Sequence, residues 1–477
     1  MIMKKLIINT LLLSSAALLP VVAPSALAAG EAKNVIFFLG DGMGPTTVTA
    51  ARIYKYKEEG ELNMEKLDGK TRTARVKTYS NDAQTTDSAP SMAAYMTGVK
   101  MNNEVLSMSP DTKAIKPTGA DSNCPATGNG TPVDTILEIA KAKGKAVGAV
   151  STARITHATP AATYSHICHR DAENNIAAQA IVGGAGYNTK LGTGLDVLLG
   201  GGRDYFLPNT GVGVAKGKRT DGRDLTAEAI TQGYTYVNSG SALTAVDAKN
   251  TTKLFGLFNA SHMEYELDRV KKSIDEPSLT TMTMKAIDVL GKNSKGFFLM
   301  VEGGRIDHAL HGTNAKRVME DTVAFDDAIK AALDEMQKRD PGLTNTLIVV
   351  TADHDHTMTF NGYGKRGSDV LGTVKNYKDG KELLDVNGKN YTALVFGNGP
   401  NRPAVRSTLV EGTADATQVL HDDYLQEAGV KVGLGGESHG GGDVMLFATG
   451  AGAASKTFKG TIDNTKVFSL LNTAFGF

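Results

Sequence analysis

Short hydrophobic runs rich in β-branched and aromatic residues alternate along the chain with segments of helical periodicity. These runs cover 34–39, 145–151, 296–301, 346–351, 392–396 and 443–449. Continuous apolar strands are typical of a parallel sheet that is buried on both faces, and intervening helices provide its crossover connections. The pattern therefore predicts an α/β fold of three layers, α/β/α, with a mostly parallel central sheet.

Two of the helical segments can be placed from their apolar positions. In the first, Thr131 is expected to cap the helix and Pro132 to occupy its first turn, ahead of apolar residues at i, i+3, i+4 and i+7: Val133, Ile136, Leu137 and Ala140. This helix should lead directly into the strand at 145–151. A second, longer helix is predicted over 316–338.

Two regions, 191–250 and 362–437, are rich in Gly, Asn, Thr and Asp and have weak periodicity. The chain contains no convincing internal repeat and no low-complexity linker. We therefore expect one domain over 29–477, with these two regions as loop-rich insertions into its core.

The first 28 residues have the layout of a secretory signal peptide. Lys4 and Lys5 precede an apolar run over 6–22, and Ala26-Leu27-Ala28 provides a site for cleavage after Ala28. A membrane anchor is the alternative, but polar residues and Pro20 interrupt the run. We expect a bacterial export signal that sends the chain to the periplasm or the medium, with no membrane attachment after cleavage.

The overall charge gives no reason to expect a nucleic-acid partner. Lys plus Arg and Asp plus Glu both number 51, and removal of Lys4 and Lys5 leaves only a small negative charge. No bulk field then draws the protein to nucleic acid, so selectivity must come from a local site.

The chain has two cysteines, Cys124 and Cys168. In an exported protein such a pair passes through an oxidising compartment, and a single disulfide is the preferred interpretation. Two separate buried thiols are the alternative, because the sequence does not show whether the two Cα atoms come within bridging range.

Polar clusters follow several of the predicted strands, where open α/β sheets usually bind ligands. They are Asp41-Gly42-Met43-Gly44 and the segments 302–311, 351–356 and 437–441. Asp307 and His311 are four residues apart, so a helix would place both on one side, where carboxylate and imidazole groups can bind one zinc ion. Each cluster alone is more often a turn or an ordinary histidine, but together they favour a site for several metal ions.

The segment Thr86-Asp87-Ser88-Ala89-Pro90-Ser91 precedes a helical run over 92–96. Asp and Ser are common helix caps and Pro fits a first turn, so a simple helix start is the alternative to a catalytic role. A serine hydroxyl needs a base or a metal to become a nucleophile, and no histidine is nearby in sequence. A zinc ion could stabilise the Ser88 alkoxide while the helix N-terminus receives an anionic substrate.

Taken together and in order, six motifs resemble the alkaline phosphatase family from Asn34 to the end of the chain. They are Asp41-Gly42-Met43-Gly44, Asp87-Ser88-Ala89, His157-Ala158-Thr159-Pro160, the segments 302–311 and 351–356, and Glu437-Ser438-His439-Gly440-Gly441. The resemblance implies an exported phosphomonoesterase that acts on small phosphate monoesters, forms a phosphoserine intermediate and has an alkaline pH optimum. It also implies a homodimer with two zinc ions and one magnesium ion per subunit.

The resemblance assigns the metal ligands residue by residue. The first zinc falls on Asp307, His311 and His439, the second on Asp41, Asp353 and His354, and magnesium on Asp41, Thr159 and Glu302. Ser88 matches the nucleophile, and Arg170 matches the arginine that binds two phosphate oxygens, a contact that suits a planar guanidinium.

Four further residues lie, by resemblance, beside these groups without direct metal bonds: Asp87, His157, His308 and His356. His157 and His308 replace the Asp and Lys of some bacterial members and agree with the animal enzymes. This change removes negative charge beside the magnesium, so we expect Zn²⁺ or Co²⁺ to compete there. The remaining histidines match no ligand position and are interpreted as ordinary ones: His166, His169, His262 and His421.

Two other kinds of function remain as alternatives. A sulfatase or phosphodiesterase of the same superfamily would share the fold, but sulfatases need an arginine in the motif that here reads Ser88-Ala89-Pro90-Ser91-Met92. A non-catalytic protein that stores zinc or captures phosphate would keep the metal ligands, but it would need neither Ser88 nor Arg170.

Overall fold

The computed structural model describes residues 32–67, 73–210, 216–402, 418–433, 435–451 and 454–477. The predicted signal peptide lies outside these residues. Within them, every helix is too short or too polar to cross a membrane.

A ten-stranded sheet forms the centre of the molecule, in the order β15-β2-β14-β8-β1-β7-β3-β4-β6-β5. Its middle consists of parallel strands, namely β8 (Thr346–Thr351), β1 (Asn34–Gly40), β7 (Phe297–Gly303) and β3 (Ala146–Arg154). On one side of them, β14 (Val444–Gly450) runs antiparallel and joins β2 (Thr73–Lys77) and β15 (Gly460–Asp463). On the other side lie β4 (Val197–Gly201), β6 (Leu254–Leu257) and β5 (Thr235–Val237). The predicted mostly parallel sheet is confirmed.

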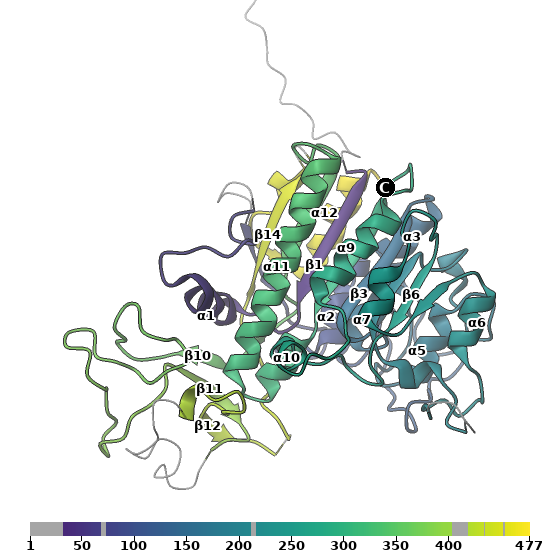
Figure 1. Cartoon of the computed structure of the whole chain (residues 1–477). Coiled ribbons are helices and arrows are strands. Elements are labelled where there is room, and N and C mark those ends of the chain that lie inside the picture. The colour runs from purple at the N-terminus through teal and green to yellow at the C-terminus, as the bar shows by residue number, and fades with distance from the viewer. Residues whose placement is uncertain (1–31, 68–72, 211–215, 403–417, 434, 452–453) are drawn as a thin grey trace, which may run out of the picture.

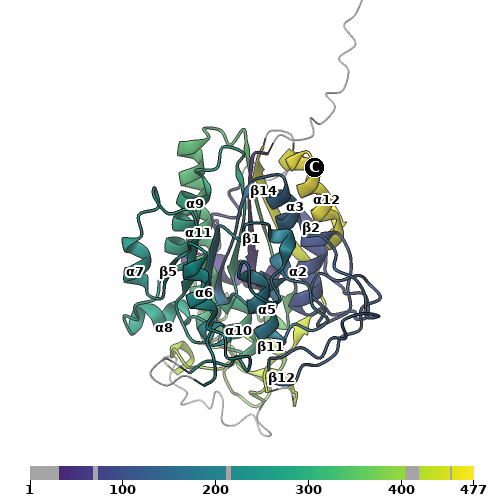
Figure 2. The ribbon, with the colours of Figure 1, turned by 90° about the vertical axis from the view of Figure 1, so that its right-hand side faces the viewer.

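Helices cover both faces of this sheet (Figures 1 and 2). One layer contains α2 (Ser88–Thr97), α3 (Ile136–Ala142), α4 (Ala158–Tyr164), α5 (Glu173–Ala180) and α12 (Asn464–Phe475). The other contains α1 (Pro45–Tyr56), α8 (Glu266–Lys271), α9 (Leu279–Leu290), α10 (Arg305–His311) and α11 (Ala315–Arg339). The short helices α6 (Leu225–Thr231) and α7 (Gly240–Ala245) pack near β5 and α9.

Strand β1 connects the two halves of the hydrophobic core. Phe37 and Phe38 are fully buried neighbours, and successive side chains of a strand point to opposite faces. The Phe37 ring lies 5.7 Å from that of Tyr95 in α2, whereas the Phe38 ring lies 5.9 Å from that of Phe325 in α11. The sheet is therefore packed on both faces, as the three-layer prediction requires.

One of the two predicted helices is confirmed, and the other begins later than expected. Helix α11 spans the region predicted as 316–338. Helix α3 begins at Ile136, because Thr135 and Glu138 form a capping box in which Thr135 Oγ1 accepts from the Glu138 N–H at 3.2 Å. The predicted start at Thr131 is wrong: the Thr131 N–H donates to Ser109 Oγ at 2.9 Å, and Pro132 forms a bridge with residue 108.

The two glycine-rich regions differ in their relation to the core. The first, 191–250, contains β4 and β5 of the main sheet, so the expectation of an excursion is wrong for these strands. The second contributes β11 (Leu394–Gly399) and β12 (Ala428–Lys431), which join β10 (Met358–Phe360) in a separate three-stranded sheet at the lower left of Figure 1. The strand predicted at 392–396 thus lies outside the main sheet and runs antiparallel to β10.

Candidate active site

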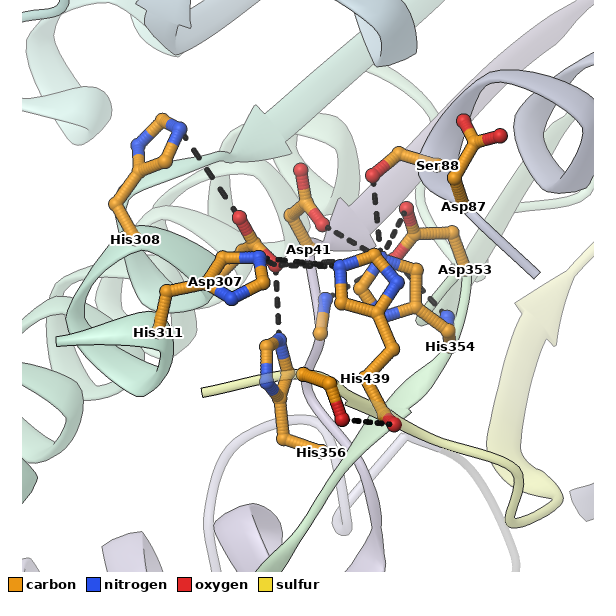
Figure 3. Close-up of polar contacts among 12 residues, drawn as sticks. Asp41, Asp87, Ser88, Asp307, His308, His311, Asp353, His354, His356 and His439 are labelled. Carbon is orange, nitrogen blue, oxygen red and sulfur yellow. Dashed lines mark hydrogen bonds and ion pairs between the residues drawn. The ribbon is translucent and has the colours of Figure 1, made fainter. Parts of the chain in front are cut away.

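The polar segments that follow β1, β7 and β8 meet at one edge of the sheet. The three strands are parallel and in register, with Gly40 opposite Gly303 and Leu39 opposite Thr351. Their carboxyl ends therefore deliver Asp41, helix α10 and the segment 352–356 to the same place. Figure 3 shows the side chains from these segments turned toward one another.

Asp41, Asp353 and His354 form one group of ligands suited to a metal ion, and all three are fully buried. His354 Nε2 lies 3.4 Å from Asp41 Oδ1 and 3.3 Å from Asp353 Oδ2. Among the described residues these two carboxylate oxygens have no hydrogen-bond partner, whereas Asp353 Oδ1 accepts from the Gly42 N–H at 3.0 Å. Buried oxygens without partners are costly, and a bound cation would satisfy them.

Asp307, His311 and His439 form a second group beside the first. His311 Nε2 lies 3.1 Å from His439 Nε2 and 3.3 Å from Asp307 Oδ1. His439 Nε2 lies 3.6 Å from the same Asp307 oxygen. Asp307 and His311 face one side of α10, as their spacing predicted.

The backbone fixes the tautomers of three imidazoles in these groups. Nδ1 of His311 donates to the carbonyl of Glu437 at 2.5 Å, and Nδ1 of His439 to the carbonyl of Thr86 at 2.8 Å. Nδ1 of His354 is 3.3 Å from the Asp355 carbonyl. Each ring then points an Nε2 lone pair inward, which is the arrangement that a metal ion requires. The donor set therefore fits a pair of zinc ions.

His356 differs from these three rings, because both of its nitrogens contact carboxylates. Nδ1 lies 2.5 Å from Glu437 Oε2, and Nε2 lies 2.8 Å from Asp307 Oδ1. Burial alone would lower the pKa of His356, but the two carboxylates raise it to about 10. With one nitrogen on Glu437 and the other on Asp307, the ring is placed to orient the Asp307 carboxylate.

A third group is suited to a harder cation. Ligand atoms of Asp41, His157 and Glu302 lie near one another, and Thr159 Oγ1 is 3.5 Å from Asp41 Oδ2. Ser151 donates to one Glu302 oxygen, whereas the other has no partner among the described residues. Burial raises the pKa of Glu302 to about 7. Carboxylate and hydroxyl oxygens together are the ligands that Mg²⁺ prefers.

Ser88 is the first residue of α2, directly after the cap Asp87. Its Oγ lies 3.1 Å from His354 Nε2, so the hydroxyl faces the first of the groups described above (Figure 3). Asp87 Oδ1 accepts from the Ala89 N–H at 2.7 Å and from Arg170 Nη1 at 2.9 Å. The helix cap thus places Ser88 and a guanidinium beside each other, at a helix N-terminus that favours anions.

Two glycines explain the Asp41-Gly42-Met43-Gly44 motif. Gly42 has a φ of +66°, and a Cβ there would lie 2.4 Å from His356 Cδ2. A Cβ on Gly44 would lie 1.6 Å from Asp355 Oδ1. Both positions must lack a side chain for the segments after β1 and β8 to approach this closely. The contact also gives Asp355 a packing role that the sequence did not indicate.

His262, which matches no ligand position in the sequence, lies in a cluster of histidines beside the third group. Its ring lies 4.1 Å from that of His308 and 5.2 Å from that of His157. A guanidinium contacts each of these rings, so one lone pair of each imidazole accepts a hydrogen bond; the partners are Arg170 for His157, Arg154 for His262 and Arg305 for His308. His262 lies after β6 in the sequence, far from His157 and His308. Only the folded structure brings the three rings together.

The predicted disulfide is present between Cys124 and Cys168, whose Cα atoms lie 5.9 Å apart. It joins the segment before α3 to the loop that carries Arg170. His166 also lies outside the site, since its Nε2 contacts Glu138 Oε1 at 2.7 Å.

Comparisons with known proteins agree with this site. A family model described as alkaline phosphatase matches residues 32–477. The human tissue-nonspecific alkaline phosphatase is 38% identical over 443 residues, covering 88% of this chain and 79% of the relative. An alkaline phosphatase from Gadus morhua is 37% identical over 446 residues, covering 88% of this chain and 87% of the relative.

Solved structures show the same similarity. The alkaline phosphatase of Thermus thermophilus has a TM-score of 0.66 and 26% identity, covering 96% of this chain and 95% of its own. The enzyme from the Antarctic bacterium TAB5 has a TM-score of 0.63 and 25% identity, covering 94% of this chain and 99% of its own. This chain belongs to the alkaline phosphatase family and is a phosphomonoesterase, as its six motifs predicted.

Proposed function

We propose that this protein is an exported alkaline phosphatase that hydrolyses phosphate monoesters through a phosphoserine at Ser88. The observation that carries the proposal is the position of the Ser88 hydroxyl, 3.1 Å from His354 Nε2. The same nitrogen faces the Asp41 and Asp353 oxygens that have no partner among the described residues. A hydroxyl that shares a cation site with such ligands can be held as an alkoxide at moderate pH.

We assign three cations to the ligand groups. The first zinc would be held by Asp307, His311 and His439, the second zinc by Asp41, Asp353 and His354, and magnesium by Asp41, Thr159 and Glu302. Zn²⁺ or Co²⁺ competes with Mg²⁺ at the last group because His157 lies beside it. When bound, these ions lower the pKa of coordinated hydroxyl groups and neutralise charge that develops on phosphoryl oxygens.

The residues of the chain perform the rest of the reaction. The Ser88 oxygen bonds to phosphorus as the bond from phosphorus to the alcohol oxygen breaks, and the alcohol leaves with a proton from solvent. Water then attacks the phosphoserine, releases inorganic phosphate and returns a proton to Ser88. Arg170 binds phosphate oxygens throughout. Asp87 accepts a hydrogen bond from Nη1 of the guanidinium and His157 accepts one from Nη2, each at 2.9 Å, and a guanidinium has five N–H donors in all.

Export, an alkaline optimum and a homodimer belong to the same proposal. The basic and apolar start of the chain supports export. Membership of the alkaline phosphatase family supports association of two copies. A monomer mass in light scattering would contradict the dimer, and a pH–rate profile that peaks below neutrality would contradict the alkaline optimum.

The test is hydrolysis of p-nitrophenyl phosphate by the wild type and by Ser88→Ala, with zinc and magnesium present and after treatment with a chelator. We expect repeated turnover by the wild type and a loss of at least about 1000-fold in both the variant and the chelated enzyme. Ser165→Ala is the matched control, because its buried hydroxyl has no hydrogen-bond partner among the described residues and removal should leave activity intact.

The same assay separates the alternatives. A zinc store or phosphate trap would release at most one equivalent of product per chain. A sulfatase or phosphodiesterase would prefer a sulfate ester or a bis-nitrophenyl phosphate over the monoester. Full activity in Ser88→Ala would show that the nucleophile is a different group.

A further inference from the structure

Glu437 is a buried carboxylate at the site that the reaction does not use. It is 2% exposed and precedes β13 (His439–Gly440), which pairs with β9 (Asp355–His356). Burial of a glutamate is costly unless its charge is paired and its oxygens accept hydrogen bonds. Both conditions are met here, and one of the partners, His356, contacts a ligand assigned to the first zinc.

The carboxylate fixes the orientation of Asp307 through one intermediate ring. Glu437 Oε2 contacts His356 Nδ1 at 2.5 Å, and His356 Nε2 contacts Asp307 Oδ1 at 2.8 Å. Oε1 accepts from the Thr357 N–H at 2.6 Å and also from the Thr357 hydroxyl. Glu437 is therefore clamped from two sides, and it holds His356 against the Asp307 oxygen that faces the metal ligands.

The backbone of the same residue fixes His311. The Glu437 N–H donates to the His311 carbonyl at 2.9 Å, and His311 Nδ1 donates to the Glu437 carbonyl at 2.5 Å. The ring can then turn only Nε2 toward the other ligands. His439, the third ligand, follows two residues later, opposite His356 in the β13–β9 pair.

We propose that Glu437 is a positioning residue that sets how firmly the group Asp307, His311 and His439 retains its divalent cation. The proposal rests on the assignment of this group to the first zinc in the proposed function. Ligands held in place before binding lose little entropy when the ion binds, and loss of such outer contacts typically weakens metal affinity about 10-fold to 100-fold. Among the described residues, Glu437 makes no hydrogen bond to Asp41, Asp353 or His354, the ligands assigned to the second zinc.

Replacement by glutamine tests the charge and the acceptor pattern with little change in shape. Both carboxylate oxygens accept from N–H groups, of His356 on one side and Thr357 on the other. A glutamine amide has only one acceptor oxygen, so its NH₂ group would face one of these donors and leave it unsatisfied. The clamp on His356 should loosen without any change to a metal ligand.

The experiment follows the release of zinc from the fully loaded protein to a colorimetric chelator, for the wild type, Glu437→Gln and a matched control. The control is Glu138→Gln: Glu138 is also 2% exposed and contacts a histidine, His166, at 2.7 Å, but it lies away from the site. We expect Glu437→Gln to release one zinc equivalent at least about 10-fold faster and the second at the wild-type rate. Saturating zinc should restore its kcat.

Glu138→Gln should lower the melting temperature and leave zinc release unchanged. If Glu437→Gln does not fold, Glu437→Asp decides the question, because the shorter side chain cannot reach both His356 and Thr357 and should also release one equivalent faster. Release at the wild-type rate in the folded variant, or equal acceleration in the Glu138 control, would overturn the proposal. Failure of the proposed function is distinguishable, since the wild type would then bind zinc without hydrolysing the ester.

Discussion

The disulfide between Cys124 and Cys168 should contribute to stability and leave catalysis almost unchanged. Its two cysteines are 44 residues apart in sequence, and the bond closes that loop in the unfolded chain. The chain-entropy estimate for a loop of this length is about 4 kcal/mol at 25 °C. The perturbation is replacement of both residues by serine, which removes the cross-link with little change in volume.

The active site should tolerate this loss, because other contacts hold the loop that carries Arg170. The Arg170 N–H donates to the Glu104 carbonyl at 2.8 Å, and Leu106 and Ile167 exchange two backbone hydrogen bonds of 3.0 Å. The guanidinium is held separately by Asp87 at 2.9 Å. We therefore expect KM for the ester and the inhibition constant for phosphate to change by less than about 3-fold, since none of these contacts involves sulfur.

Calorimetry of the metal-loaded protein measures the change in melting temperature on loss of the disulfide. A chain of about 450 residues has an unfolding entropy of about 0.9 kcal/mol/K, so a loss of about 4 kcal/mol lowers the melting temperature by about 4 °C. The wild type in a phosphine reductant, which does not bind zinc strongly, should show the same shift. An unchanged melting temperature would refute the loop-closure argument, and a 10-fold rise in KM would show that Arg170 depends on the disulfide.

Two further predictions concern packing and pH. Gly44→Ala should lower activity at least about 10-fold, because its Cβ would lie 1.6 Å from Asp355 Oδ1. Adding Asp355→Ala to the same chain should restore part of the activity. Gly433→Ala is the control and should be neutral in the same assay, because a Cβ there would have nothing within 4 Å. Burial raises the pKa of Asp321 to about 8, so between pH 4 and 8 the folded state keeps a proton that the unfolded state releases, and stability falls as pH rises. Asp321→Asn should therefore raise the melting temperature more at pH 9 than at pH 5, and an equal change at both values would contradict the assignment.

The strands that carry the site could be predicted because local sequence decides them. The runs 34–39, 296–301 and 346–351 are mostly apolar. In the structure, β1 buries every residue from Val35 onward, and β7 and β8 bury all of their residues. Parallel strands in one sheet bring their carboxyl ends to one edge, so the clusters after them had to meet. Helix α10 then places Asp307 and His311 on one side, as a spacing of four residues requires.

Strands β4 and β5 could not be predicted in the same way, because some of their residues are fixed by packing against other parts of the chain and not by a local hydrophobic pattern. Gly200 in β4 has no room for a side chain: a Cβ there would lie 2.6 Å from Ile155 Cγ2 and 2.7 Å from the Ser151 carbonyl. A glycine that permits close packing is indistinguishable in sequence from a glycine in a loop. The contacts of His262 and Glu437 were hidden for a related reason, since their partners are far away in the chain.

The site as a whole is a set of groups that tolerate one another only around cations. Burial and the neighbouring Asp353 raise the pKa of Asp41 well above its usual value, and burial raises that of Glu302 to about 7. In the adjacent group, the Nε2 atoms of His311 and His439 lie 3.1 Å apart, each with its other nitrogen donating to a carbonyl. Repulsion between the carboxylates, and between imidazole lone pairs that face each other, opposes folding. The packed strands and helices must therefore supply the stability that holds these groups together. The same opposition favours metal binding, because a divalent cation would attract the carboxylate oxygens and imidazole lone pairs that otherwise repel one another.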